Sequence, residues 1–450
     1  MESRRRRTYL QACDLLRIAN EIAEDNDRDI FDDDDQDDAP EESDHCELEE
    51  ENLSSEFPVI DDEGDIEACE EESSDSENED SDSFDSNEED HETDIVCGDI
   101  KYRRNPYSSD TRARNILTEK PRALCSPASE MESFLLFFDE DLIRHILRYT
   151  NRKVSDVRHD HKPAPYYMKH FTYDELLACF AIIIRAGVDR DNMSDLQDLW
   201  SKIDSRPFYR ATIGFQRFKF FLRCVRFDNF RNREERKATD KLAAIRGVWN
   251  IFLNNLRRVY VPNSVITVDE QLVEYRGNIP GRTYMPSKPR KYGVKIFWAC
   301  ESTTGFALNG IIYTGKPVDG PPHKNLAFDI VFELMKPFAN TGREIVTDRF
   351  FTSHMLAKSL LEMKLTLLGT IKSGRKEIPK CLRDVKTREL HSSFSLYDHD
   401  NKIVLCSYVP KKNRNVLMLS SSHCETQISQ HERKPTIRYL TITFTKEAWI

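Results

Sequence analysis

The chain has 450 residues, enough for two or three domains, and its formal net charge of −14 conceals two oppositely charged parts. No apolar N-terminal run resembles a signal peptide, and no apolar run is long enough to span a membrane. The eleven cysteines include no Cys-x-x-Cys pair, so the composition argues against a membrane protein and against a disulfide-rich secreted one.

The negative charge is concentrated between residues 21 and 100. This segment has 39 acidic residues and one basic residue, Arg28, so it carries −38 and the rest of the chain sums to −14 + 38 = +24. Its few apolar side chains cannot offset the entropy cost of ordering, so residues 1–100 are predicted to be a disordered acidic region. The basic remainder favours a polyanionic partner, for which we expect double-stranded DNA. The alternative is that the surplus cations only keep a soluble domain dispersed.

A helical domain is predicted over residues 131–262, after a basic linker over residues 101–130. Thr172 and Glu175 have the spacing of a capping box and open one helix, which is predicted to end at Gly187. Residues 131–262 are therefore the first part of the chain in which a core can be identified.

One helix of this domain permits two interpretations. The segment from Arg217 to Phe227 interleaves basic and aromatic residues, as surfaces that stack single-stranded nucleic acid do. However, Phe218, Phe221 and Val225 also fall on one face of a helix. We therefore favour a core helix over a stacking surface.

The periodicity changes after Pro262 and predicts the element order β-β-β-α-β-α-β over residues 263–373. Asp269 ends the first predicted strand and Asp348 ends the fourth. This order resembles the ribonuclease-H-like fold, in which those two strands lie side by side. The predicted fold class is therefore α+β with several domains, and residues 374–430 are predicted to be a separate β-rich insertion. The predicted strands of the core are 265–268, 293–300, 305–314, 344–347 and 365–371, and its helices are 327–338 and one capped by Ser353.

Two neighbouring carboxylates at this position suit phosphoryl transfer. Enzymes that cut or join nucleic acid hold two divalent ions about 3.5–4 Å apart between acidic side chains. Hard oxygen ligands select Mg²⁺ or Mn²⁺, so Asp269 and Asp348 are candidate metal ligands for Mg²⁺. The alternative is that each aspartate only forms a turn or caps a helix, which is common at strand ends.

Longer motifs surround both aspartates. They are Thr267–Leu272, Tyr275–Gly277 and Pro286–Lys295 near the first acid, Val346–Ala357 around the second, and Leu367–Lys372 in the next strand. These segments resemble the signature of piggyBac transposases, and the resemblance covers about residues 133 to 433.

The resemblance implies a helical DNA-binding and dimerisation domain, then a ribonuclease-H-like core with an inserted β-rich domain. Transposases of this kind use three acidic residues to excise and reinsert DNA at TTAA targets. A nuclear location, a double-stranded DNA partner and a Mg²⁺ cofactor follow, with neither a membrane nor a small-molecule substrate, and a homodimer is one assembly to expect. The implied catalytic and metal-binding residues are Asp269 and Asp348. The candidate DNA-binding residues are cations of the basic stretch after Asp269, namely Arg276, Arg282, Lys288, Arg290, Lys291 and Lys295.

The sequence departs from the piggyBac pattern near its end. A Lys-Gly-Gly-Val-Asp motif, which would supply the third acid, and a Cys/His-rich zinc module are absent. Residues 431–450 are therefore expected to be an aberrant, truncated tail. The function we expect is a DNA-binding relic of a cut-and-paste transposase without catalysis. The alternatives are an active enzyme that receives its third acid in trans, and a decayed product without a function.

Overall fold

The computed structural model covers most of the chain beyond the acidic region. The central part of the predicted linker and the predicted aberrant tail lie outside the described residues, as does nearly all of the acidic region. Within the described part, no helix is long and apolar enough to cross a membrane. The described residues are 94–107, 117–191, 194–203, 205–275, 279, 281–285, 291–315 and 325–423.

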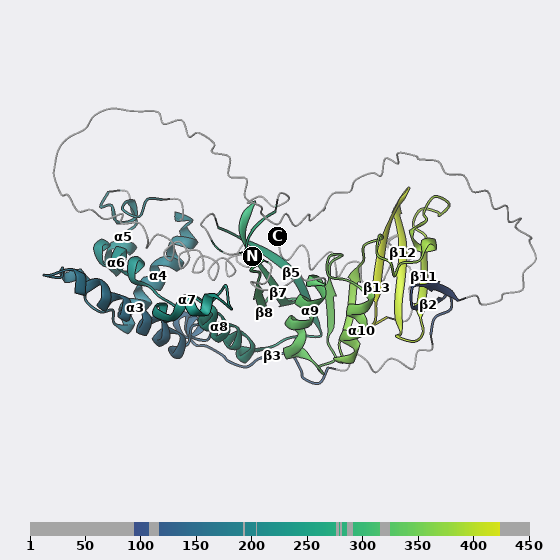
Figure 1. The fold of residues 1–450 in the computed structure, drawn as a ribbon, viewed down its shortest axis with the longest axis horizontal. Helices are drawn as coiled ribbons and strands as arrows, with labels where there is room; N and C mark the ends of the chain where they lie inside the picture. Colours follow the sequence, from purple (N-terminus) through teal and green to yellow (C-terminus); the bar gives the residue numbers. More distant parts are fainter. Residues whose placement is uncertain are drawn as a thin grey trace, which may run out of the picture.

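Helices gather at one end of the elongated molecule, where residues 130–259 fold around their own apolar core (Figure 1). The α-helices are α2 (Glu130–Leu135), α3 (Glu140–Asp160), α4 (Tyr173–Asp189), α5 (Pro207–Thr212), α6 (Phe215–Cys224), α7 (Arg233–Lys237) and α8 (Arg246–Val259). Short 3-10 helices η4 (Tyr166–Met168), η6 (Asp198–Trp200) and η7 (Phe230–Asn232) connect them.

Local sequence explains the boundaries of α4. The Thr172 side chain accepts from the backbone of Glu175, and the Glu175 side chain accepts from the backbone of Thr172, so the predicted capping box is present. The helix continues two residues past the predicted end at Gly187. It ends at Arg190, a left-handed residue (φ 62°) whose N–H reaches the carbonyls of Ala186 and Gly187.

Helix α6 belongs to the core of the helical end. Its residues Phe218, Phe220 and Phe221 are buried among other aromatic rings. Even Arg217 is buried, because its guanidinium forms an ion pair with Glu175 and lies 3.6 Å from the centre of the Phe171 ring. These three rings of α6 are thus unavailable for stacking bases, and the core interpretation is the one that the packing supports.

The central sheet begins with the predicted element order. Strands β5 (Val265–Glu274), β7 (Tyr292–Glu301) and β8 (Ala307–Ile312) are followed by α9 (Leu326–Met335), β9 (Glu344–Thr347), α10 (His354–Glu362) and β10 (Thr366–Thr370). Strand β9 lies between β5 and β10 and is parallel to both, whereas β7 is antiparallel to β5. The first and fourth strands of the predicted order are therefore neighbours. Strand β6 (Arg282–Tyr284) was not predicted and pairs with β7.

The predicted β-rich insertion is not a separate sheet. Its strands β11 (Ser393–Asp398), β12 (Ile403–Lys411) and β13 (Arg414–Ser420) extend the central sheet, because β13 pairs with β10 in antiparallel fashion. The complete order is β1-β2-β11-β12-β13-β10-β9-β5-β7-β6, with β8 also on β7. The sequence predicted that this segment is rich in strands, but pairing between distant strands leaves no local signal.

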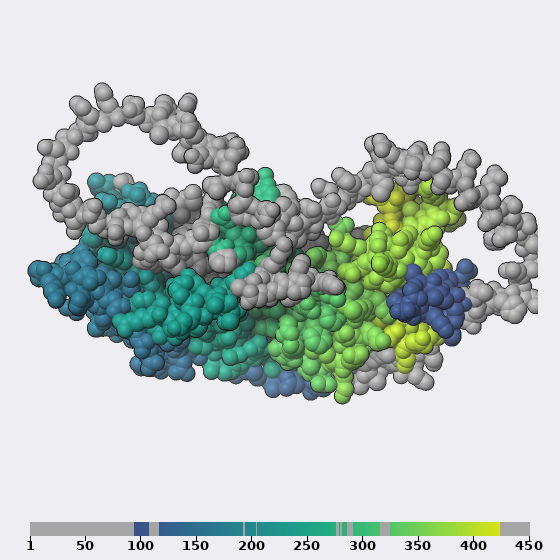
Figure 2. All heavy atoms as spheres, in the orientation of Figure 1, coloured from purple at the N-terminus to yellow at the C-terminus, as the bar shows by residue number. Residues whose placement is uncertain are grey.

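Residues 94–103 also join this sheet, although the prediction divided them between the disordered region and the linker. Strand β1 (Ile95–Cys97) and strand β2 (Ile100–Arg103) form a hairpin whose second strand pairs with β11. Figure 2 shows this segment in dark blue against the C-terminal strands. Tyr102 is fully buried there, and its hydroxyl donates to the carbonyl of Glu377. The acidic region is thus attached to the body through an ordered hairpin.

Helices cover the two faces of the sheet at different places. One face packs on α9 and α10 through the largest apolar cluster, which includes Val268, Phe297 and Leu360. The opposite face of β7 packs on α8, where the rings of Trp249 and Trp298 lie 5.5 Å apart. Helix α8 therefore joins the helical end of the molecule to the sheet.

Candidate catalytic site

Strand register brings the two predicted acids together. Val268 on β5 is the partner of Thr347 on β9 in a parallel pair, so the next residues of the two strands, Asp269 and Asp348, are neighbours. Adjacent strands lie about 4.8 Å apart, and residues in register on neighbouring strands share a face. Both residues are partly buried.

Asp269 was predicted to end its strand, but it lies in the middle of β5. Strand β5 continues to Glu274 because its second half pairs with β7 alone, from the Asp269–Trp298 pair to the Glu274–Gly293 pair. Asp269 therefore sits where β5 separates from β9. Its Oδ1 accepts the N–H of Glu270 at 2.8 Å, which orients the carboxylate.

Asp348 begins a tight turn. Its Oδ1 accepts the N–H of Phe350 at 3.0 Å, and its carbonyl oxygen accepts the N–H of Thr352 at 3.1 Å. The Thr352 hydroxyl also lies 2.7 Å from that carbonyl and 2.7 Å from the hydroxyl of Thr347. The turn-forming role is therefore present, and it also fixes the direction in which the carboxylate points.

A close approach of β10 supports this turn. A Cβ atom on Gly369 would lie 2.2 Å from the Thr352 hydroxyl oxygen and 2.6 Å from the carbonyl oxygen of Thr347. Only glycine leaves room for both atoms, since the second belongs to rigid backbone. Gly369 thus allows the Thr347–Thr352 contact that holds the Asp348 turn in place.

The acid pair offers the right type of ligand for a divalent ion, but it offers too few ligands. Carboxylate oxygens are the ligands that Mg²⁺ prefers. Among the described residues, however, no three His, Cys, Asp or Glu side chains come together as a metal-binding group. This part of the chain supplies two carboxylates, fewer than the set that the predicted two-metal chemistry uses.

The predicted DNA-binding residues divide into three groups. Arg282 lies on β6, partly buried, with its guanidinium 5.7 Å from the centre of the Tyr292 ring, and Lys291 is exposed just before β7. Lys295 is only 3% exposed, because β7 is covered on both faces, and its ammonium lies 5.6 Å from the Phe350 ring. Lys295 thus belongs to the core beside the Asp348 turn and not to the surface. The others, Arg276, Lys288 and Arg290, lie outside the described residues.

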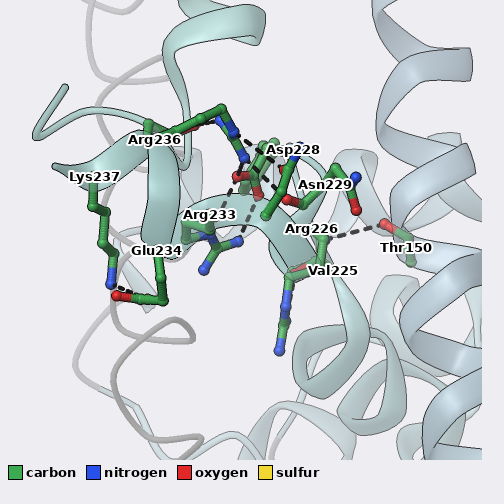
Figure 3. Close-up of polar contacts among 12 residues, drawn as sticks. Thr150, Val225, Arg226, Asp228, Asn229, Arg233, Glu234, Arg236 and Lys237 are labelled. Atoms are coloured by element: carbon green, nitrogen blue, oxygen red, sulfur yellow. Dashed lines mark hydrogen bonds and ion pairs between the residues drawn. The ribbon is translucent and has the colours of Figure 1, made fainter. Parts of the chain in front are cut away.

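An arginine-rich segment after α6 was not predicted as a site. Buried Asp228 accepts hydrogen bonds from Arg233 at 2.6 Å and from Arg236 (Figure 3). Arg226 is also buried, yet among the described residues its side chain donates only to the backbone carbonyls of Arg223 and Val225. The run of arginines between residues 223 and 236 was the available signal, but periodicity cannot show which of them lack a carboxylate partner.

The comparisons with known proteins agree with this architecture. A family model described as Transposase IS4 matches residues 129–442. The chain is also similar to a piggyBac transposase in a cryo-EM structure of its synaptic complex with hairpin DNA. The two are 32% identical with a TM-score of 0.66, and the similarity covers 73% of this chain and 67% of that one.

The family match and the similarity to the solved structure both include the helical end and the part of the sheet that bears the acid pair. The chain belongs to the transposase IS4 family, and its relatedness is to the piggyBac type within it. The resemblance that the motifs around Asp269 and Asp348 indicated is confirmed.

Proposed function

We propose that the protein binds double-stranded DNA and presents it to the Asp269–Asp348 pair. The observation that carries this proposal is the register of β5 and β9, which makes the two acids neighbours on one sheet. Arg282 and Lys291 come from the β6–β7 segment, which pairs with the same strand that bears Asp269. The net charge of +24 outside residues 21–100 supports a polyanionic partner. The related piggyBac transposase was solved with hairpin DNA.

Binding of a labelled duplex by the full chain, measured at several salt concentrations, tests this proposal. Each phosphate neutralised by the protein adds about 0.9 to the slope of log K against log salt. We expect a steep decline of affinity with salt and weak dependence on sequence. Affinity that does not change with salt, or no binding at low salt, would overturn the proposal.

The finer proposal is a ribonuclease-H-like core that acts in the nucleus as a DNA-binding relic without catalysis. Its basis is the element order around β5 and β9, together with the lack of a third metal-binding side chain beside the acid pair among the described residues. The alternative is an active transposase that receives a third acid in trans. Formation of a hairpin or a strand-transfer product on a labelled DNA end with Mg²⁺ would favour that alternative.

Asp269 and Asp348 are the residues that would hold Mg²⁺. A bound ion would supply Lewis-acid stabilisation of charge on a phosphate oxygen. With two carboxylates from the described residues, we expect weak binding of a single ion. Calorimetric titration of Mn²⁺ into the wild-type protein and Asp269→Asn measures this, and two tight sites in the wild type would contradict it.

A further inference from the structure

Lys153 and Arg226 are two cations of the helical end that are close enough to repel each other. The backbone N–H of Arg226 donates to the Thr150 hydroxyl of α3 at 3.2 Å, and Lys153 lies one helical turn further along α3. The Lys153 ammonium lies 5.6 Å from the centre of the Phe230 ring, just after Arg226 in the chain. Both side chains therefore belong to the junction between α3 and the end of α6.

Only one nitrogen of the Arg226 guanidinium donates hydrogen bonds to described residues. Its Nη1 donates to the carbonyl oxygens of Val225 at 2.7 Å and Arg223 at 3.2 Å. Its Nε and Nη2 make no hydrogen bond to any described residue, and neither is among the fully buried atoms that lack a partner. This edge therefore reaches solvent, although the residue as a whole is only 6% exposed. The Nε–Nη2 edge is the fork that binds two oxygens of a phosphate.

The carboxylates nearby are already neutralised by other arginines. Asp156 pairs with Arg231 at 2.7 Å, and Asp228 pairs with Arg233 and Arg236. In Figure 3 the Arg226 side chain runs away from the Asp228 cluster. Lys153 and Arg226 thus carry a surplus of positive charge, because the nearby acids form ion pairs with other arginines.

The pKa values of both cations are lowered, and the nearby acids offset only part of the shift, Asp228 for Arg226 and Asp156 for Lys153. Burial, and then the charge of Arg233, lower the pKa of Arg226 to about 10. Burial also lowers the pKa of Lys153, and the charges of Arg226 and Arg223 lower it further. Both shifts mean that the positive forms are destabilised where they stand, and a bound anion would reverse this effect.

We propose that Lys153 and Arg226 form a binding site for one phosphate of a nucleic-acid backbone. Arg226 supplies a bidentate fork that is anchored by its own backbone contacts, and Lys153 supplies a point charge from α3. The assignment of the phosphate to DNA rests on the proposed function. Because the site is made by the helical end and not by the β6–β7 segment, it gives the DNA a second point of attachment away from Asp269 and Asp348.

The first test is the salt dependence of duplex DNA binding by the full chain with Lys153→Gln. Loss of one phosphate contact should lower the slope of log K against log salt by about 0.9, and Lys153→Arg should restore it. The matched control is Arg144→Gln, since Arg144 lies on the same helix but is exposed and paired with Glu140 at 2.5 Å. That control should leave the slope unchanged. Wild-type slopes in both Lys153→Gln and Arg226→Gln would overturn the site and leave DNA binding standing.

A second arm separates a DNA phosphate from free phosphate. Inorganic phosphate should raise the thermal unfolding midpoint of the wild-type protein and should raise it less in Lys153→Gln. If the wild type binds no DNA but shows this difference, the site holds and its ligand is free phosphate, so only the proposed function fails. If phosphate raises both midpoints equally and DNA binding is also absent, both proposals are overturned. Thermal unfolding also reports whether each variant is folded.

Discussion

The acid pair on β5 and β9 and the arginine-rich segment after α6 both hold charged groups partly away from water, but with different partners. Asp269 is oriented by the N–H of the next residue in its strand, and Asp348 by an N–H of its own turn. Buried Asp228 is instead neutralised by Arg233 and Arg236, and within the described part of the chain the Arg226 side chain donates only to backbone carbonyls. The carboxylates of the acid pair are thus placed by the backbone that follows them, whereas the carboxylate of Asp228 holds two arginines together. By this comparison, Asp228 is structural, and the acid pair and Arg226 are functional candidates.

The largest loss of stability is expected from Asp228→Asn, which removes the charge that neutralises two arginines. The change leaves Arg233 and Arg236 without their buried counter-charge, next to the already unpaired Arg226. Loss of one partner from a buried ion pair costs about 3–5 kcal/mol. Urea unfolding measures the loss. The control is Glu234→Gln, whose pair with Lys237 is exposed, and it should change stability by less than about 0.5 kcal/mol.

A smaller loss is expected from Gly369→Ala, which disturbs the support of the Asp348 turn. The new methyl group would overlap the Thr352 hydroxyl and the backbone of Thr347, and overpacking of this kind costs about 1–3 kcal/mol. The matched control is Gly374→Ala, because nothing lies within 4 Å of a Cβ at that position. Equal stability of the two variants in urea unfolding would show that β10 does not press on the turn.

The positions of the two acids could largely be predicted, because each follows a short pattern in the local sequence. The four buried residues of β9 and the acid after them form a short pattern that periodicity detects. The second half of β5 was missed because its residues, from Asp269 to Glu274, are half-exposed and partly polar, like a loop. Their pairing with β7 overrides that local preference.

Other features depend on contacts between distant residues and left no pattern to detect. The join between β10 and β13 and the hairpin of β1 and β2 are of this kind. Burial of Lys295 follows from the two covered faces of β7, which a single strand does not reveal. The same holds for Arg226, since its lack of a carboxylate is a property of α3 and α6 together.

The smallest effect is expected from removing residues 1–93, most of which belong to the predicted acidic region. The cut keeps β1 and β2, which are part of the sheet. If the acids compete with DNA for cations such as Arg226, the shortened protein should bind duplex DNA more tightly at low salt. The advantage should shrink at high salt, where exposed charges are screened. A full-length variant with these acids changed to Asn and Gln should behave like the deletion, and unchanged low-salt affinity in both would dismiss the competition.

The central claim is that the protein holds DNA at an acid pair without cutting it. One experiment tests this directly: a labelled duplex end is incubated with the full chain and Mg²⁺, and bound DNA and cleaved or hairpin products are measured in the same reaction. We predict bound DNA without products, and the same outcome for Asp269→Asn. Products formed by the wild type and lost in Asp269→Asn would contradict the claim and would establish an active transposase.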